Sequence, residues 1–216
     1  MVRKTDWTRE ELEDKIVSKM TAVTVPVNVR LEGVHRVLDF SEMREILANA
    51  KLISLGECGC RKDLKKCDSP LDVCICLNED AEEYISQGLG SKVSLEEALG
   101  ALRRSHEAGL VHIAYTFKES DRPNIVCSCC SCCCHSMSAL VRFGIPEAVV
   151  ASRYVAKNNL ETCIGCGTCV ERCQFKARHI EEGKLVYDEA RCFGCGVCVS
   201  TCPTKSIFLE KRKLNG

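Results

Sequence analysis

The sequence predicts an α+β protein in two parts: a mixed α/β, cysteine-rich N-terminal domain over residues 1–152 and a small C-terminal module over residues 153–216. A chain of 216 residues is long enough for one sizeable domain and a small one. Helix-start signals alternate with β-branched, strand-like segments in the first part. In the second part a cysteine pattern that starts at Cys163 repeats from Cys192, which predicts two half-modules around a pseudo-twofold axis.

Two capping boxes mark helix starts, Thr8-Arg9-Glu10-Glu11 and Ser94-Leu95-Glu96-Glu97, because Ser or Thr and a Glu three residues later satisfy free backbone N–H groups. Pro26 cannot donate a ladder hydrogen bond, so the strand that contains it is expected at a sheet edge. The expected helices cover 8–20, 39–50, 81–87, 94–108 and an apolar stretch from 135 to about 143. The expected strands cover 21–31, 51–55 and 110–117, with a hairpin turn at 180–185 and a loop over 56–76.

The C-terminal cysteines form two runs with one spacing. The first is Cys163-x2-Cys166-x2-Cys169-x3-Cys173, and the second is Cys192-x2-Cys195-x2-Cys198-x3-Cys202-Pro203. Short x2 loops aim three thiolates at one iron–sulfur cubane, and the intervening glycines let the backbone approach the inorganic sulfides. Two structural zinc sites are the alternative, but zinc binds two separated Cys pairs and leaves the other cysteines of each run without a role.

Residues 155–210 therefore resemble a bacterial 2[4Fe-4S] ferredoxin domain, about a quarter of the chain. The expected module is a small ferredoxin-type fold with two [4Fe-4S] clusters, unstructured without iron. In this pattern the fourth cysteine of each run ligates the cluster of the other run. The expected ligands are Cys163, Cys166, Cys169 and Cys202 for one cluster, and Cys192, Cys195, Cys198 and Cys173 for the other.

One residue departs from this pattern. Gln174 follows Cys173, whereas Pro203 follows Cys202 as the pattern requires. Since the proline shapes the exit from the loop and adds no ligand, we expect a small change of geometry or potential and no loss of the cluster.

Eleven of the nineteen cysteines lie outside these two runs. Cys76 alone could be a small core residue, but such dense clustering is not needed for packing. We expect one or two further iron–sulfur clusters shared between the segments 58–76 and 127–134, because a redox centre beside the module extends an electron path. One or two zinc ions that tie the segments together are the alternative. The expected ligands, with their partition left open, are Cys58, Cys60, Cys67, Cys74, Cys127, Cys129, Cys130, Cys132, Cys133 and Cys134.

Three residues outside the cysteine set also need an interpretation. His135 is either a further ligand or the start of a helix. Arg61 either donates hydrogen bonds to a cluster or is a surface charge, and His112 is expected to be a hydrogen-bonded core histidine. The whole cysteine arrangement resembles uncharacterised 4Fe-4S dicluster proteins of anaerobic microbes, a resemblance that implies no particular activity.

Composition limits the partners. Lys and Arg together number 30, as do Asp and Glu, so the zero net charge gives no support for nucleic acid. No apolar run approaches the roughly 20 residues that span a bilayer. The N-terminal residues lack the apolar segment of a secretory signal, so we expect a cytoplasmic, anaerobic setting in which cysteines bind metal.

We therefore expect an electron-transfer protein that passes single low-potential electrons through its clusters to or from a partner redox protein. The alternative is an oxidoreductase, or a subunit of one, whose N-terminal cluster is catalytic and is fed by the module. A redox sensor with exposed thiols is a third interpretation. The sequence contains no nucleotide or flavin motif and leaves the catalytic residues and the oligomeric state open.

Overall fold

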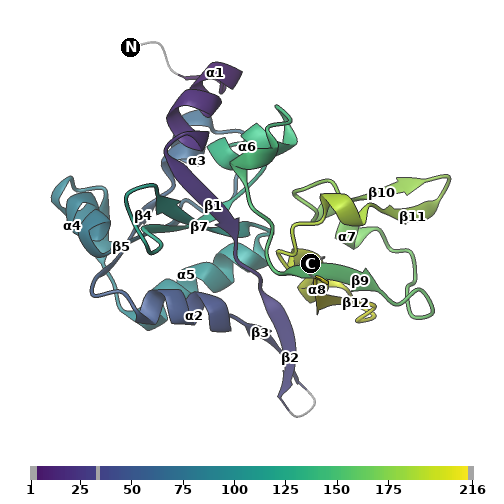
Figure 1. The fold of residues 1–216 in the computed structure, drawn as a ribbon. Helices are drawn as coiled ribbons and strands as arrows, with labels where there is room; N and C mark the ends of the chain where they lie inside the picture. The colour runs from purple at the N-terminus through teal and green to yellow at the C-terminus, as the bar shows by residue number, and fades with distance from the viewer. Residues whose placement is uncertain (1–3, 33–34, 214–216) are drawn as a thin grey trace.

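The computed structural model describes residues 4–32 and 35–213, and its mixture of helices and strands confirms the α+β class. Its largest element is a six-stranded antiparallel sheet in the order β1-β7-β8-β5-β4-β6 (Figure 1). The strands are β1 Met20–Thr24, β4 Ile53–Glu57, β5 Asp72–Leu77, β6 Gly90–Lys92, β7 Val111–Phe117 and β8 Ile125–Cys129. No helix in the described residues is long and apolar enough to span a membrane.

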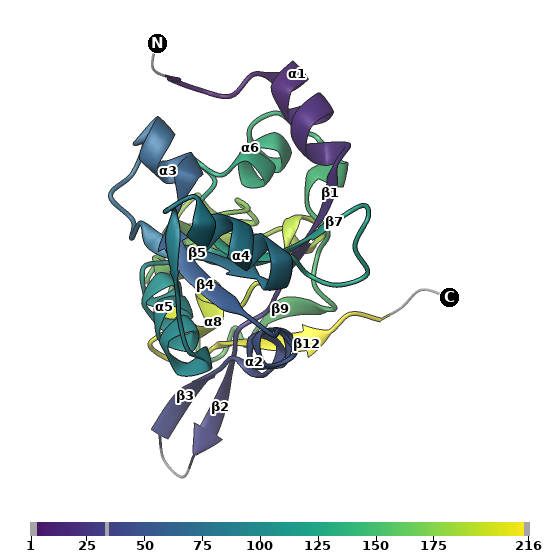
Figure 2. The same cartoon turned by 90° about the vertical axis from the view of Figure 1, so that its left-hand side faces the viewer.

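Helices cover both faces of this sheet (Figures 1 and 2). On one face lie α2 (Ser41–Ala48) and α5 (Leu95–Glu107), which bury Met43, Leu47 and Leu102 against Ile75 and Val126. On the other lie α1 (Arg9–Leu12), its continuation η1 (Glu13–Val17), α3 (Gly59–Leu64) and α6 (His135–Val141). The helix α4 (Asn78–Ser86) packs along β4, β5 and β6.

The two sheet faces differ because side chains alternate along a strand. Val111, Ile113 and Tyr115 of β7 point to the side of α6, where they form a core with Leu12 and Met137. Cys127 and Cys129 of β8 share that face, since they pair with Ile113 and Val111. The strand register therefore places the cysteines of β8 on one face, and Ala114, Val126 and the buried pair His112 and Ser128 on the other.

Both capping boxes are present in the structure, at Thr8 and Ser94. Three boundaries differ from expectation. The first helix gives way to the π-helical turn η1, and β1 already begins at Met20. The expected strand 21–31 is broken at Pro26 into the edge strand β1 and β2 (Asn28–Glu32), which pairs with β3 (His35–Asp39). The segment 56–76, expected as a loop, forms α3 and β5.

The C-terminal module repeats its backbone as well as its cysteines. Its helices are α7 (Thr168–Glu171), η3 (Glu189–Arg191) and α8 (Val197–Thr201). The strand β9 (Tyr154–Asn158) pairs with β12 (Ile207–Lys211). The strands β10 (Arg178–Glu181) and β11 (Lys184–Tyr187) form the expected hairpin. Gly167 and Gly196 begin the two helices with φ of 75° and 83°. Lys176 and Lys205 also correspond, with φ of 56° and 58°.

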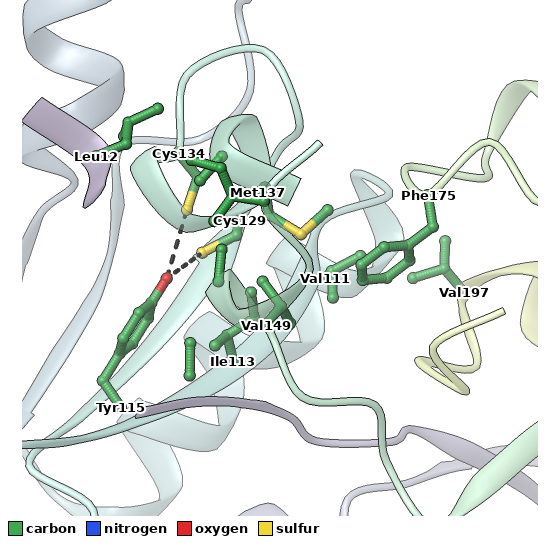
Figure 3. Packing of buried hydrophobic residues seen from close by; sticks show 14 residues of the cluster. Leu12, Val111, Ile113, Tyr115, Cys129, Cys134, Met137, Val149, Phe175 and Val197 are labelled. Atoms are coloured by element: carbon green, nitrogen blue, oxygen red, sulfur yellow. Dashed lines mark hydrogen bonds between the residues drawn. The ribbon is translucent and has the colours of Figure 1, made fainter. Parts of the chain in front are cut away.

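The module lies against the sheet domain. Two backbone hydrogen bonds join them: Val27 N–H donates to Cys195 O over 3.1 Å, and Ser152 N–H donates to Phe193 O over 3.1 Å. Phe175 and Val197 of the module belong to the same buried core as Val111 and Met137 (Figure 3). The two-domain boundary at residue 152 remains a prediction.

Candidate metal centres

The eight cysteines of the C-terminal runs line two pockets. Cys163, Cys166 and Cys169 share one pocket with Cys202, from the second run. Cys192, Cys195 and Cys198 share the other with Cys173, from the first run. Each pocket thus combines three thiols of one run with the fourth thiol of the other.

Backbone geometry aims these thiols. The left-handed glycines Gly167 and Gly196 turn the chain into α7 and α8, and each helix leads to the last cysteine of its run. The backbone N–H of Ala177 donates to Cys173 Sγ over 3.3 Å, and that of Ser206 donates to Cys202 Sγ over 3.2 Å. Such N–H···S bonds orient a ligand and stabilise its thiolate form.

Arg178 lies between the two pockets. It is 2% exposed, and the sulfurs of Cys198 and Cys169, one from each pocket, lie near its guanidinium. Nη1 and Nη2 are buried with no oxygen acceptor in the described residues, and the guanidinium rests 4.3 Å from the centre of the Tyr187 ring. An unpaired buried cation is costly, so anionic groups are required beside it. Two thiolate-bound iron–sulfur clusters fit this requirement.

The two pockets differ in exposure. At the outer pocket Cys166 is exposed, Ile164 is 67% exposed, and hydrogen bonds from Thr168 lower the pKa of the Cys166 thiol. At the inner pocket burial raises the pKa of Cys198 to about 12. Phe175 stacks on Phe193 there, with ring centres 4.4 Å apart. The outer pocket therefore contains the most exposed cysteine of the two quartets, while Cys173, Cys192 and Cys195 of the inner pocket are half-buried.

The N-terminal cysteines separate into two groups. The four-thiol group comprises Cys67, Cys130, Cys132 and Cys133, whose Sγ atoms all lie within 4.8 Å of one another. Cys67 Sγ lies 3.7 Å from Cys130 Sγ, and Cys132 Sγ lies 3.8 Å from Cys133 Sγ. Burial opposes ionisation of Cys67, but hydrogen bonds from the Ser69 backbone and hydroxyl, with its thiol neighbours, lower its pKa to about 7.

Arg61 lies beside this group. It is 2% exposed rather than a surface charge, and its Nη2 donates to Ser128 O over 2.9 Å and lies 3.8 Å from Cys130 Sγ. Nη1 donates to Pro70 O. The guanidinium thus joins the segment after α3 to the end of β8 and places a positive charge beside a thiol.

The second group, which we call the sheet-face group, lies on the β5–β8 surface under α3 and α6. Its members are Cys58, Cys60, Cys74, Cys127, Cys129 and Cys134. Cys74 faces Cys127 across the strands, because Ile75 pairs with Val126 in the antiparallel register. Cys76 neighbours Cys74 at the edge of the group.

Two aromatic side chains complete the sheet-face group. His135 Nδ1 lies 3.3 Å from Cys60 Sγ, while its buried Nε2 has no partner in the described residues. Tyr115 Oη lies 3.4 Å from Cys134 Sγ and 3.8 Å from Cys129 Sγ (Figure 3). Burial raises the pKa of Cys60 to about 12 and lowers that of His135, so the free side chains are neutral.

Protonated thiols must lose their protons to bind a metal, whereas a neutral imidazole already offers the lone pair of one ring nitrogen. Since a metal binds the thiolate, loading of the sheet-face group would release protons. Burial likewise raises the pKa of Cys58 to about 11. Metal uptake by this group would therefore be coupled to pH.

His112 and Gln174 also have defined hydrogen-bond partners. His112 is a core histidine: its Nδ1 lies 3.1 Å from Ser128 Oγ, and its ring stacks on His106. The expected geometric effect of Gln174 has a specific form, because its Oε1 accepts from Ser131 N–H over 3.0 Å and from Ser131 Oγ–H over 2.9 Å. Sequence reasoning did not predict Arg178 or Tyr115, since a lone Arg or Tyr in a strand carries no local signal of its partners.

Comparison with known proteins supports the C-terminal assignment. A family model described as a 4Fe-4S dicluster domain matches residues 162–206. A search of curated proteins finds no match to the chain. The family match supports [4Fe-4S] clusters as the cofactors of the C-terminal module, beside a cysteine-rich region to which it assigns nothing.

Proposed function

We propose that this protein transfers single low-potential electrons through two [4Fe-4S] clusters of the C-terminal module to or from a further cluster in the sheet-face group. The ligands are Cys163, Cys166, Cys169 and Cys202 for the outer cluster, Cys192, Cys195, Cys198 and Cys173 for the inner one. The observation that carries this proposal is the serial placement of the pockets: the outer one is near solvent, and the inner one is packed against the cysteine-bearing core.

A partner redox protein would exchange electrons at the outer pocket. Cys166 is exposed there, and the apolar side chains Ile164 and Leu160 are 67% and 74% exposed. Electron transfer requires close approach but no stable complex, and small interfaces of this kind are typical of redox encounters.

The inner pocket leads on to the sheet-face group. Phe175 and Val197 line that pocket and also belong to the core that contains Cys129 and Cys134 (Figure 3). A bound iron–sulfur cluster supplies a one-electron redox centre. The chain itself excludes water from the inner pocket, donates N–H···S bonds, and places Arg178 where it compensates negative charge.

The sheet-face group suits a polynuclear cluster. Six thiols and the imidazole of His135 exceed the four ligands of a single tetrahedral ion. They come from four elements, α3, β5, β8 and α6, so their sulfurs surround a common region rather than one point. We therefore assign the additional iron to this group.

The test is an anaerobic redox titration followed by electron paramagnetic resonance, with iron and sulfide counted per chain. The wild type should take up one electron per module cluster and at least one more at the N-terminal cluster. Cys195→Ser should lose the inner cluster, and Cys74→Ser should lose the N-terminal signal alone. A chain whose iron is not reversibly reduced would contradict the electron-transfer role.

A catalytic N-terminal cluster is the second candidate function. It is favoured by His135, whose imidazole is a more easily displaced ligand than thiolate and stands beside Cys60. Cyanide or carbon monoxide should then shift the paramagnetic signal that Cys74→Ser removes. An unshifted signal would leave electron transfer as the function.

A further inference from the structure

We propose that the four-thiol group, Cys67, Cys130, Cys132 and Cys133, binds one tetrahedral zinc ion that is separate from every iron–sulfur cluster of the protein. This proposal does not rest on the electron-transfer function. It divides the N-terminal thiols into one structural metal site and one redox site.

Sulfur–sulfur distances carry the assignment. In a tetrahedron with zinc–sulfur bonds of about 2.3 Å, the sulfurs lie about 3.8 Å apart. The Sγ–Sγ distance is 3.7 Å between Cys67 and Cys130 and 3.8 Å between Cys132 and Cys133, and all four sulfurs lie within 4.8 Å of one another. The group therefore already has the dimensions of a single-ion site.

A cubane needs a wider arrangement. Its four thiolates bind four different iron atoms, so their sulfurs lie farther apart than the sulfurs around one ion. In the part of the chain that the structure describes, no three of the C-terminal cysteine sulfurs lie within 4.8 Å of one another. The two kinds of site thus differ in size within one molecule.

The surroundings suit a closed site with net negative charge. Four thiolates around Zn²⁺ leave two negative charges, and Arg61 approaches Cys130 while Arg142 lies near Cys132 and Cys133. Ser69 and the backbone of Lys66 donate hydrogen bonds to the ligand sulfurs. Four protein ligands leave no position for substrate, which is the arrangement of structural zinc.

The position of the site gives it a structural role. Cys67 belongs to the connection between α3 and β5, and the other three thiols belong to the turn between β8 and α6. Trp7 Nε1–H donates to Cys133 O over 2.8 Å, and Gln174 of the C-terminal module binds Ser131 inside the same turn. One ion would therefore fix the turn on which the module docks.

The experiment uses the full chain, purified anaerobically from medium that supplies both iron and zinc. Zinc, iron and acid-labile sulfide are counted, and zinc-edge X-ray absorption reports the ligands without interference from iron. We expect one zinc per chain, with four sulfur neighbours at about 2.3 Å. Cys67→Ser should lose the zinc or replace one sulfur neighbour by oxygen, with iron and sulfide unchanged.

Cys74→Ser of the sheet-face group is the matched control and should keep the zinc while losing iron. Three outcomes would overturn the proposal: loss of iron and sulfide together in Cys67→Ser, a zinc spectrum with fewer than four sulfurs in the wild type, or an iron ion without sulfide at this site. If Cys67→Ser fails to fold, the wild-type absorption spectrum alone decides the question.

Discussion

Gly196→Ala should separate the C-terminal module from the sheet domain, whereas Gly167→Ala should not. The two glycines are equivalent in the internal repeat and both have positive φ, 83° and 75°. A Cβ on Gly196 would lie 1.7 Å from Val27 O, and a Cβ on Gly167 would meet nothing within 4 Å. Both variants share the cost of an alanine at positive φ, so the difference between their stabilities reports the contact with Val27 alone.

The magnitude follows from this geometry. A left-handed alanine costs about 1–2 kcal/mol at either position. At Gly196 the Val27 backbone must also withdraw by more than about 1 Å to reach an allowed contact, which breaks the Val27 N–H···Cys195 O bond. The lost bond costs about 1 kcal/mol, and the forced repacking about 1–3 kcal/mol more. Gly196→Ala should thus destabilise the protein by about 2–4 kcal/mol more than Gly167→Ala.

Anaerobic urea titration measures both variants with two probes. Cluster absorbance reports the module, and the fluorescence of the single tryptophan, Trp7, reports the sheet domain. The wild type should show coincident transitions, and Gly196→Ala should show the module unfolding earlier. If both alanine variants lose the same stability, then the module does not dock through Val27 and the reasoning fails.

Three further perturbations test other contacts. Gln174→Pro, which restores the usual ferredoxin residue, should retain both clusters but lose the hydrogen bonds to Ser131. The docking of the module should weaken by about 1–3 kcal/mol. Hydrogen exchange at the Ser131 amide measures this loss, and unchanged protection would contradict it. Arg178→Met should make the module clusters harder to reduce, because a buried cation favours the more negative, reduced state. Redox titration should show a shift to lower potential, and an unshifted potential would exclude this role for Arg178. Burial lowers the pKa of His106 to about 4 from 6.5, so its contribution to stability is full above pH 6.5 and is lost as pH falls toward 4. Stability should therefore drop by about 2 kcal/mol from this residue between pH 7 and pH 5, a drop that His106→Gln should remove in urea titrations.

The features that sequence predicted well are those decided by neighbouring residues. The Ser94 capping box starts α5, and Gly109 follows its end with φ of 84°, because capping depends on a few adjacent groups. The two quartets expected from the repeat each line one pocket, and their role as cluster ligands stays a prediction. Neither result needs knowledge of distant contacts.

The features that sequence did not predict depend on tertiary contacts. Cys74 and Cys76 were expected in a loop, yet they alternate with Val73 and Ile75 along β5, because cysteine packs in a sheet as a small apolar residue. The division of the N-terminal thiols follows from the pairing of β5 with β8, which no local pattern encodes. The sequence left open whether Arg61 is a surface charge, because its burial depends on the packing of distant segments.

Several contacts hold the C-terminal module against the sheet domain. Its departure from the usual pattern, Gln174, binds Ser131, and Arg172 donates to the backbone oxygens of His106 and Glu107 at the end of α5. Gly196 lies against Val27, and each of these contacts surrounds the inner pocket. A ferredoxin that carries electrons between partners must leave its clusters approachable from solvent. Here the contacts around the inner pocket hold the module against the sheet domain, while Cys166 of the outer pocket is exposed. In the proposed function, an electron that enters at Cys166 would therefore continue through the inner pocket toward the sheet-face cysteines.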